Sequence, residues 1–489
     1  MATLPAPTTA PAKMSRSMRG ALLRFAPAAV TIVGVAALLR VVYNPWYLNY
    51  DARYALLWAR DVWRGFTPDF EAGFAPTPHP LSTAVSSLGL PFGHSGDAVS
   101  VWIVLLSFGA LVWLTYRLGS VLFSEWAGAA AALVVLTRPV LGRDVLLAYQ
   151  DVPFAALIVG AVLFEAQQRR RGAPVLALLA LAGLLRPEAW VLAGLYVVWM
   201  WPAAPSWRGR LQLIGLAALA PVVWALIDLL VTGDPLHSLH GTAALADEVN
   251  RRRSVGEVPH WTLTYFAFTL REPISLGIPV GLLFAWRHAR SRAALPFAVA
   301  VVMTLVFAIG PIFGLPLIAR YIRTPAVLLT LFYGLALFGW MSLPRGRERM
   351  AWAAAALVVL GLFAYFAPKN AKMLDGLRLR SEREGRFYRD LQRVGEAPGV
   401  RAAFARCAPL TATDHRPIPY IRWWLDGNPG SVGTLENGSM PRGRLVLTPR
   451  RTRLTQRFYQ ENFPLYTRPA GYRILYENHN WRVYAAAGC

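Results

Sequence analysis

Eleven apolar segments separated by short polar loops constrain this chain more than any other feature of its sequence. They carry few charges and fall near 24–43, 98–116, 126–142, 152–165, 173–185, 189–201, 211–231, 274–286, 294–312, 324–343 and 350–367. A helix needs about 20 mostly apolar residues to cross a bilayer. The 489 residues are 55% hydrophobic and 16% charged, which lies outside the range of soluble globular domains. The sequence therefore predicts a polytopic α-helical membrane protein.

The segments 173–185 and 189–201 are each only 13 residues long, and only Arg186-Pro-Glu188 separates them. They form either one long helix or two short ones. A single helix would place Arg186 near the middle of the bilayer and a proline in its interior, and both are costly. Two helices also leave the short arginine-rich loops on one face, as the positive-inside rule requires. These loops hold Arg117, Arg169 to Arg171, Arg208, Arg210, Arg287, Arg290, Arg292, Arg345, Arg347 and Arg349.

We therefore expect about eleven transmembrane helices in the plasma or inner membrane, with the N-terminus cytoplasmic and the C-terminus outside. Residues 1–23 form a disordered cytoplasmic tail, and residues 24–367 form the transmembrane domain. Its first outer loop, residues 44–97, is too long and too rich in charged and aromatic residues for a simple connector. The net charge is +23, and much of the positive charge lies in short loops between spans, which favours membrane lipids over nucleic acid as a partner.

Residues 368–489 are expected to form a small extracytoplasmic α/β domain. The alternating segment 471–484 predicts a hairpin with a polar turn near 478–480, and residues 442–449 predict another strand. Residues 383–394 predict a short amphipathic helix. Both cysteines of the chain, Cys407 and Cys489, lie in this part. An oxidising compartment favours a disulfide between them, and two buried free thiols are the alternative.

Asp51 is the first candidate for chemistry, because it follows the first apolar segment and opens the long outer loop. Acids at such a depth are costly and usually functional. It could act as the general base that takes a proton from an acceptor hydroxyl. Alternatively, it pairs with Arg53 or caps the amphipathic helix that follows. Arg53 itself is a candidate contact for the substrate.

Asp151 begins another apolar segment on the same face of the membrane. An acid at a helix start is favoured by capping and by the helix dipole, which is the structural interpretation. The functional one is a second catalytic carboxylate that shares a divalent cation with Asp51. One carboxylate from each of two loops suits Mg²⁺ or Mn²⁺ completed by phosphate oxygens and water.

Four further residues are candidates for binding a phosphate group. Arginine suits bidentate phosphate binding, and Arg186, Arg320 and Arg323 lie at outer helix ends. Snorkelling to the interface is the alternative for each. His79 lies in the extended stretch Pro76-Thr-Pro-His-Pro80 and could bind phosphate or metal, or be structural.

The order of these motifs resembles that of the GT-C membrane glycosyltransferases, in particular the branch with the protein O-mannosyltransferases and the lipid A aminoarabinose transferases. The resemblance covers about residues 24–345. Its motifs are the Asp51 loop with its Arg-Tyr helix, the Pro-His-Pro-Leu segment, Asp151-Val-Pro153, Leu185-Arg-Pro-Glu188, Gly233-Asp-Pro-Leu236 and Arg320-Tyr321. The basic residue that the family often has in a Lys-Pro-Pro segment is replaced here by Thr77-Pro-His79.

The resemblance implies an enzyme that takes a sugar from a polyprenyl-phosphate carrier and passes it, usually with inversion, to a lipid, glycan or protein acceptor on the outer face. By position, Asp51 would be the base and Asp151 its acidic partner, with Arg186 and Arg320 at the lipid phosphate. A lipid or sugar transporter and a non-catalytic envelope assembly protein are the alternatives. A transporter would have acids at mid-membrane, whereas here they cluster at one face.

Overall fold

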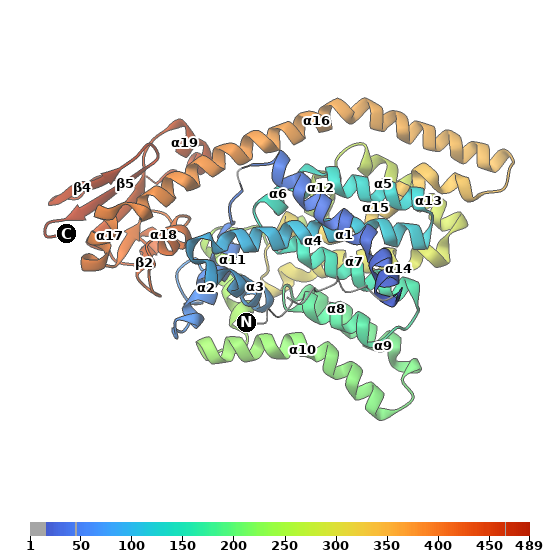
Figure 1. The fold of residues 1–489 in the computed structure, drawn as a ribbon, viewed down its shortest axis with the longest axis horizontal. Helices are drawn as coiled ribbons and strands as arrows, with labels where there is room; N and C mark the ends of the chain where they lie inside the picture. The colour runs from blue at the N-terminus through green and yellow to red at the C-terminus, as the bar shows by residue number, and fades with distance from the viewer. Residues whose placement is uncertain (1–15, 45, 465) are drawn as a thin grey trace, which may run out of the picture.

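The computed structural model describes residues 16–44, 46–464 and 466–489 as a bundle of helices with a small sheet domain at one end (Figure 1). The helices are α1 (Arg16–Val42), α2 (Tyr50–Trp63), α3 (Pro80–Ser86), α4 (Asp97–Leu122), α5 (Glu125–Thr137), α6 (Pro139–Leu146), α7 (Asp151–Gln167), α8 (Ala173–Gly183), α9 (Glu188–Met200), α10 (Trp207–Thr232), α11 (His237–Glu248), α12 (Val258–Leu270), α13 (Ile274–His288), α14 (Arg290–Ile309), α15 (Arg323–Phe338), α16 (Arg347–Glu396), α17 (Pro398–Cys407), α18 (Ile418–Trp424) and α19 (Arg453–Tyr459). The strands are β1 (Leu410–Ala412), β2 (Val432–Thr434), β3 (Leu445–Pro449), β4 (Tyr472–Glu477) and β5 (Trp481–Ala486).

A helix covers each of the eleven predicted apolar segments, which confirms a polytopic helical membrane protein. In the described part of the chain, six helices are long and apolar enough to cross a membrane, or eight if each bent pair forms one span. The others are shorter than a full span. The segment at 126–142 differs from expectation, because α5 ends at Thr137 and Pro139 begins the separate helix α6.

The ambiguous segments form two helices, α8 and α9, as predicted. They pair as an antiparallel hairpin. At one end the Trp190 indole donates to the carbonyl of Gly183 at 3.0 Å. At the other end the amide of Gly172 donates to the Tyr196 hydroxyl at 3.1 Å. The hairpin keeps Arg186 at the turn, where other polar groups can reach it.

The polar turns lie at two opposite ends of the bundle. The α9–α10 turn and the start of α16 lie on the right in Figure 1, away from the sheet. The α7–α8 turn lies at the same end as the last turn of α9, since Trp199 and Tyr196 both donate to Glu165. The arginine-rich short loops are therefore gathered at the end opposite the sheet domain.

The C-terminal domain is continuous with the bundle. The expected boundary at 367/368 lies inside α16, which runs for 50 residues, and the predicted short helix at 383–394 is its last part. The long helix carries the chain from the far end of the bundle to the sheet (Figure 1). Its end packs on β5, where the Trp481 indole donates to the carbonyl of Phe387 at 3.3 Å.

The sheet has the strand order β2-β1-β3-β5-β4. Strand β1 is parallel to β2 and β3, whereas β5 is antiparallel to β3 and β4. The β4–β5 hairpin and β3 lie where the sequence predicts them. Cys407 and Cys489 are joined by a disulfide, and their Cα atoms are 6.1 Å apart, inside the usual range.

Buried polar contacts fix the sheet domain to α2. The guanidinium of Arg422 donates to both oxygens of Asp61, at 2.8 and 2.7 Å, and both side chains are almost fully buried. Arg60 donates to the carbonyl of Gly427 at 2.8 Å. The Tyr420 hydroxyl donates to the carbonyl of Leu48 at 2.8 Å. Helix α2 therefore lies between the bundle and the C-terminal domain.

Candidate functional site

Local capping positions Asp51 in the first turn of α2. The side chain of Asn49 caps the helix by accepting from the amide of Ala52 at 3.0 Å. The Asn49 side-chain amide also donates to the carbonyl of Leu147 at 2.8 Å. This second bond ties the start of α2 to the segment just before α7. The loops that carry Asp51 and Asp151 are thereby brought to the same end of the bundle.

Asp51 pairs with Arg320, which lies 269 positions further along the chain. The guanidinium Nη1 donates to Oδ2 of Asp51 at 2.7 Å, and the two side chains keep exposed fractions of 22% and 19%. Arg320 also lies over the ring of Tyr149, 5.4 Å from its centre. Burial raises the pKa of the Asp51 carboxyl, but the charge and hydrogen bond of Arg320 outweigh it, so the pKa is lowered. Asp51 is thus a carboxylate at neutral pH.

Asp151 is buried and pairs with Arg186. Arg186 also bonds to Glu188, at 2.6 Å, and its guanidinium lies over the Tyr321 ring at 4.3 Å. Neither Asp151 nor Arg186 lines the large cavity beside Asp51, whereas Tyr321 does. The second oxygen of Asp151, Oδ2, has no hydrogen-bond partner. This buried cluster supports the cavity wall from behind.

His79 lines the same cavity. Burial lowers its pKa to about 3; Arg186 and Arg320 contribute in the same direction, and Asp51 opposes them. The imidazole is therefore neutral at physiological pH, and its Nδ1 has no hydrogen-bond partner. A neutral ring suits a hydrogen bond to a substrate hydroxyl or phosphate oxygen, and not a purely electrostatic contact.

Of the remaining predicted arginines, one reaches the cavity and one does not. Arg323 lines the cavity and donates to Asp144 at 2.9 Å and to Thr269 at 2.6 Å. Arg53 donates to Asp97 at 3.1 Å and is buried. Its guanidinium packs within 6 Å of the ring centres of Tyr420, Trp423 and Trp424 in the C-terminal domain. Arg53 therefore holds α2 against that domain, and the structure does not support a contact with substrate.

The cavity has a volume of about 1140 Å³ and lies between the bundle and the C-terminal domain. Its lining is strongly basic, with three acids, Asp51, Asp144 and Glu384, among the residues that surround it. The arginines of the lining are Arg143, Arg251, Arg252, Arg320, Arg323, Arg380, Arg383, Arg416 and Arg457. Such a cavity attracts an anionic ligand.

An apolar cavity of about 370 Å³ begins beside it. Ala52 and Gln150 line one part of it, next in sequence to Asp51 and Tyr149 of the basic cavity. The lining then follows α4, α7 and α8 to Gly160 and Leu178, and most of its surface is apolar. A molecule with a charged head and an apolar chain matches this pair of cavities.

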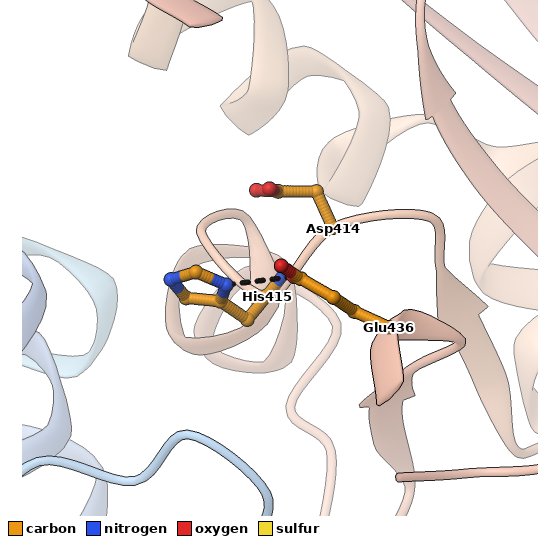
Figure 2. A group of neighbouring side chains, drawn as sticks. All are labelled: Asp414, His415 and Glu436. Atoms are coloured by element: carbon orange, nitrogen blue, oxygen red, sulfur yellow. Dashed lines mark hydrogen bonds and ion pairs between the residues drawn. The ribbon is translucent and has the colours of Figure 1, made fainter. Parts of the chain in front are cut away.

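The arrangement does not favour a metal ion between Asp51 and Asp151. Each carboxylate has an arginine partner, which already supplies the positive charge. Within the part of the chain that the structure describes, one group of three or more possible ligands lies within 4.8 Å, and it is Asp414, His415 and Glu436 (Figure 2). The arginines Arg186 and Arg320 therefore occupy the places that the expected Mg²⁺ or Mn²⁺ would take beside Asp151 and Asp51.

Sequence reasoning missed most of the cavity wall. Tyr149 lies two positions before Asp151, and Arg143 precedes it in the same outer segment. Their places in the sequence therefore indicated that they lie near the site. Asp144 follows Arg143 in the sequence, which would favour a pair between the two at the surface, but Asp144 is buried against Arg323. Nothing in the sequence indicated that the arginines of α16 and of the C-terminal domain line the cavity, because no local pattern shows that these segments fold back over Asp51.

The fold is that of the GT-C membrane glycosyltransferases, as the sequence resemblance predicts. In particular, the chain is similar to ArnT from Cupriavidus metallidurans, whose crystal structure was solved bound to undecaprenyl phosphate. The TM-score is 0.59 at 15% identity, and the alignment covers 94% of this chain and 98% of ArnT. At this identity the likeness establishes the fold alone.

A second similar structure is the oligosaccharyltransferase of Archaeoglobus fulgidus, tethered to an acceptor peptide. Its TM-score is 0.49 at 14% identity, covering 84% of this chain and 65% of that one. No family model and no curated protein matches the sequence.

Proposed function

We propose that this chain transfers a sugar from a polyprenyl-phosphate donor to an acceptor hydroxyl, with Asp51 as the general base. One observation carries the proposal: an ionised aspartate and an arginine face each other on the wall of a basic cavity that adjoins an apolar one. The ArnT-like fold supports it, because ArnT was solved with undecaprenyl phosphate.

The chemistry needs one base and one site for a phosphate. The acceptor oxygen attacks the anomeric carbon, its proton passes to a carboxylate oxygen of Asp51, and the bond from the anomeric carbon to the phosphate oxygen breaks. The phosphate leaves as an anion, so it needs positive charge and no proton donor. Arg320, which lies just before α15, and Arg323, its first residue, both line the cavity and would supply that charge. A single displacement inverts the anomeric centre.

Arg320 links donor binding to the strength of the base. In the free protein it holds the pKa of Asp51 low, which makes Asp51 a weak base. A donor phosphate competes for the same guanidinium. When Arg320 turns to the phosphate, Asp51 loses its largest charge partner while remaining buried, and its pKa rises. The base is thereby activated only when the donor is present.

The apolar cavity is the proposed place of the first isoprene units of the carrier. It begins next to Asp51 and runs between α4, α7 and α8. Burial of apolar chain contributes about 25 cal/mol per Å². The acceptor, a lipid, glycan or protein, would enter through the basic cavity, whose other wall belongs to the C-terminal domain.

The site is proposed to face the outside of the cell. The short loops rich in arginine lie at the end of the bundle opposite the cavity, and the positive-inside rule assigns that end to the cytoplasm. Single cysteines in the α11–α12 loop and the sheet domain should react with a membrane-impermeant maleimide in intact cells, whereas a cysteine in the α13–α14 turn should not. Labelling only in the α13–α14 turn would contradict this orientation.

The experiment for the proposed activity follows release of the carrier, because this readout does not depend on the sugar. Purified protein in lipid nanodiscs is incubated with an acceptor extract from the envelope and a panel of polyprenyl-phosphate sugars. We expect liberation of polyprenyl phosphate with at least one of them and no turnover of nucleotide sugars. Turnover of a nucleotide sugar without the lipid carrier would refute the donor assignment.

A glycine in the apolar cavity gives a matched test of the lipid site. A side chain at Gly160 would point toward Leu178 and Leu114, at 3.5 and 3.6 Å from its Cβ, so Gly160→Leu fills the cavity. We expect donor binding to fall about tenfold or more. The control is Gly194→Leu on α9, where nothing lies within 4 Å. Equal loss in both variants would show that the effect is not specific to this cavity and would contradict the lipid site. Unchanged donor binding by Gly160→Leu would contradict it as well.

A further inference from the structure

The end of the sheet that faces the cavity carries three side chains of metal-binding type. Asp414 and His415 follow β1, and Glu436 follows β2. Strands β1 and β2 are parallel neighbours, so their carboxyl ends meet at the same edge of the sheet. This placement brings the three side chains together although 21 positions separate His415 from Glu436. Figure 2 shows them around a common space.

The ligand atoms of the three residues lie within 4.8 Å of one another. His415 Nδ1 is 2.8 Å from Oε2 of Glu436, a hydrogen-bond contact that one shared metal ion could replace with a small shift of the side chains. The ring of His415 is fixed from the other side, because it stacks on Phe74 with centroids 4.4 Å apart and planes at 7°. The histidine is therefore held in place before any ion binds.

A buried polar group close to these side chains lacks a partner. The hydroxyl of Tyr459 is buried and has no hydrogen-bond partner among the described residues. The guanidinium of Arg416 lies 5.1 Å from the centre of the Tyr459 ring, and Arg416 also donates to Asp414, from its amide at 2.9 Å and from its guanidinium at 3.4 Å. A water bound to an ion at this place would offer the Tyr459 hydroxyl a partner.

We propose that Asp414, His415 and Glu436 bind a divalent transition-metal ion of the Zn²⁺ or Mn²⁺ type. One imidazole and two carboxylates favour such an ion over Mg²⁺, which prefers oxygen ligands alone. Three protein ligands leave at least one position open to water or substrate. His415 and Arg416 line the basic cavity, so the open position lies at its edge. The site is independent of the proposed glycosyl transfer.

The test measures metal binding directly, with no enzyme assay. Untagged full-length protein in detergent is stripped with a chelator, dialysed against ZnCl₂ or MnCl₂ and analysed for bound metal by mass spectrometry. We expect one ion per chain, and little competition from Mg²⁺ at equal concentration. His415→Gln and Glu436→Gln should each weaken binding by about tenfold to a hundredfold or more.

The matched control is His94→Gln. His94 also pairs with a carboxylate, Asp426, at 3.2 Å, but among the described residues this pair belongs to no group of three possible metal ligands. His94→Gln should leave binding unchanged. If His415→Gln fails to fold, metal binding by Glu436→Gln tests the proposal. The Glu436 side chain is 35% exposed, so this change should not prevent folding. Wild-type binding no stronger than that of Glu436→Gln would overturn the proposal and leave an ordinary His415–Glu436 ion pair.

Discussion

Helix α2 carries an aspartate–arginine pair near each of its ends, and the two pairs have opposite surroundings. Near the C-terminal end, Asp61 and Arg422 are 2% and 1% exposed and joined by two hydrogen bonds. Near the N-terminal end, Asp51 and Arg320 are joined by one hydrogen bond and are each about 20% exposed beside the cavity. In the first pair both oxygens of the carboxylate are satisfied within the protein. The second retains capacity for a ligand.

The difference shows that an ion pair alone does not indicate function. Burial raises the pKa of Asp61 although Arg422 donates to both of its oxygens. Arg320, in contrast, brings the pKa of Asp51 below its ordinary value. The Asp61 pair connects two parts of the fold. The Asp51 pair lines the cavity, and under the proposed function an incoming phosphate would take the arginine and leave the carboxylate as a base.

The largest expected effect comes from Asp51→Asn, which keeps the size of the side chain and loses its proton affinity. Donor turnover should fall by roughly 10²–10⁴ because general-base catalysis is lost. Elution from a sizing column and binding of polyprenyl phosphate should be retained. Near-normal turnover by a well-folded variant would end the assignment of Asp51 as base.

Asp61→Asn should produce the reverse pattern. It removes the hydrogen-bonded charge partner of the buried Arg422 and leaves, among the described residues, only Asp69, at 3.6 Å. Breaking one side of a buried pair costs about 3–5 kcal/mol. We expect a lower midpoint of thermal unfolding and easier proteolysis of the C-terminal domain, with turnover per folded molecule largely kept. Asp247→Asn, in the exposed pair with Arg253, is the control and should change stability little. Equal stability of the two variants would contradict this contrast.

Arg320→Gln should move the acid limb of the pH profile of kcat/KM. The pKa of Asp51 is lower in the folded protein than its ordinary value of about 3.9. Asp51 is therefore ionised at any pH above that value, and any stability that its charge confers is present there. Both are lost only when the pH falls through the folded pKa. Wild-type kcat/KM should therefore stay flat between about pH 5 and 7. Without Arg320, burial dominates and the acid limb should move to higher pH. An unchanged limb would mean that Arg320 does not tune Asp51.

The smallest expected effect is that of Arg53→Gln on donor KM. Because Arg53 pairs with Asp97 and does not line the cavity, KM should stay within about twofold. Stability should fall by about 1–3 kcal/mol, since the change leaves a largely buried carboxylate without its partner. A large rise in KM at unchanged stability would restore Arg53 as a substrate contact.

Local patterns in the sequence determined most of the architecture. Hydropathy located the eleven apolar helices, the cost of a buried arginine and proline placed the break before α9, and alternation located the β4–β5 hairpin. These features depend on periodicity, capping and turn chemistry. Such properties involve only residues that are close together in the sequence, so each segment shows them by itself. Asp51 stood out for the same reason, as a lone acid beside an apolar segment.

The tertiary structure alone decided which groups meet. It paired Asp51 with Arg320 instead of Arg53, and continued α16 through the expected domain boundary. It also brought Asp414 and Glu436 together at adjacent strand ends. Contacts between residues far apart in the chain arise from the packing of whole helices and strands, and no local pattern encodes them. The sequence by itself therefore showed where chemistry is placed, whereas the fold decided which partners control it.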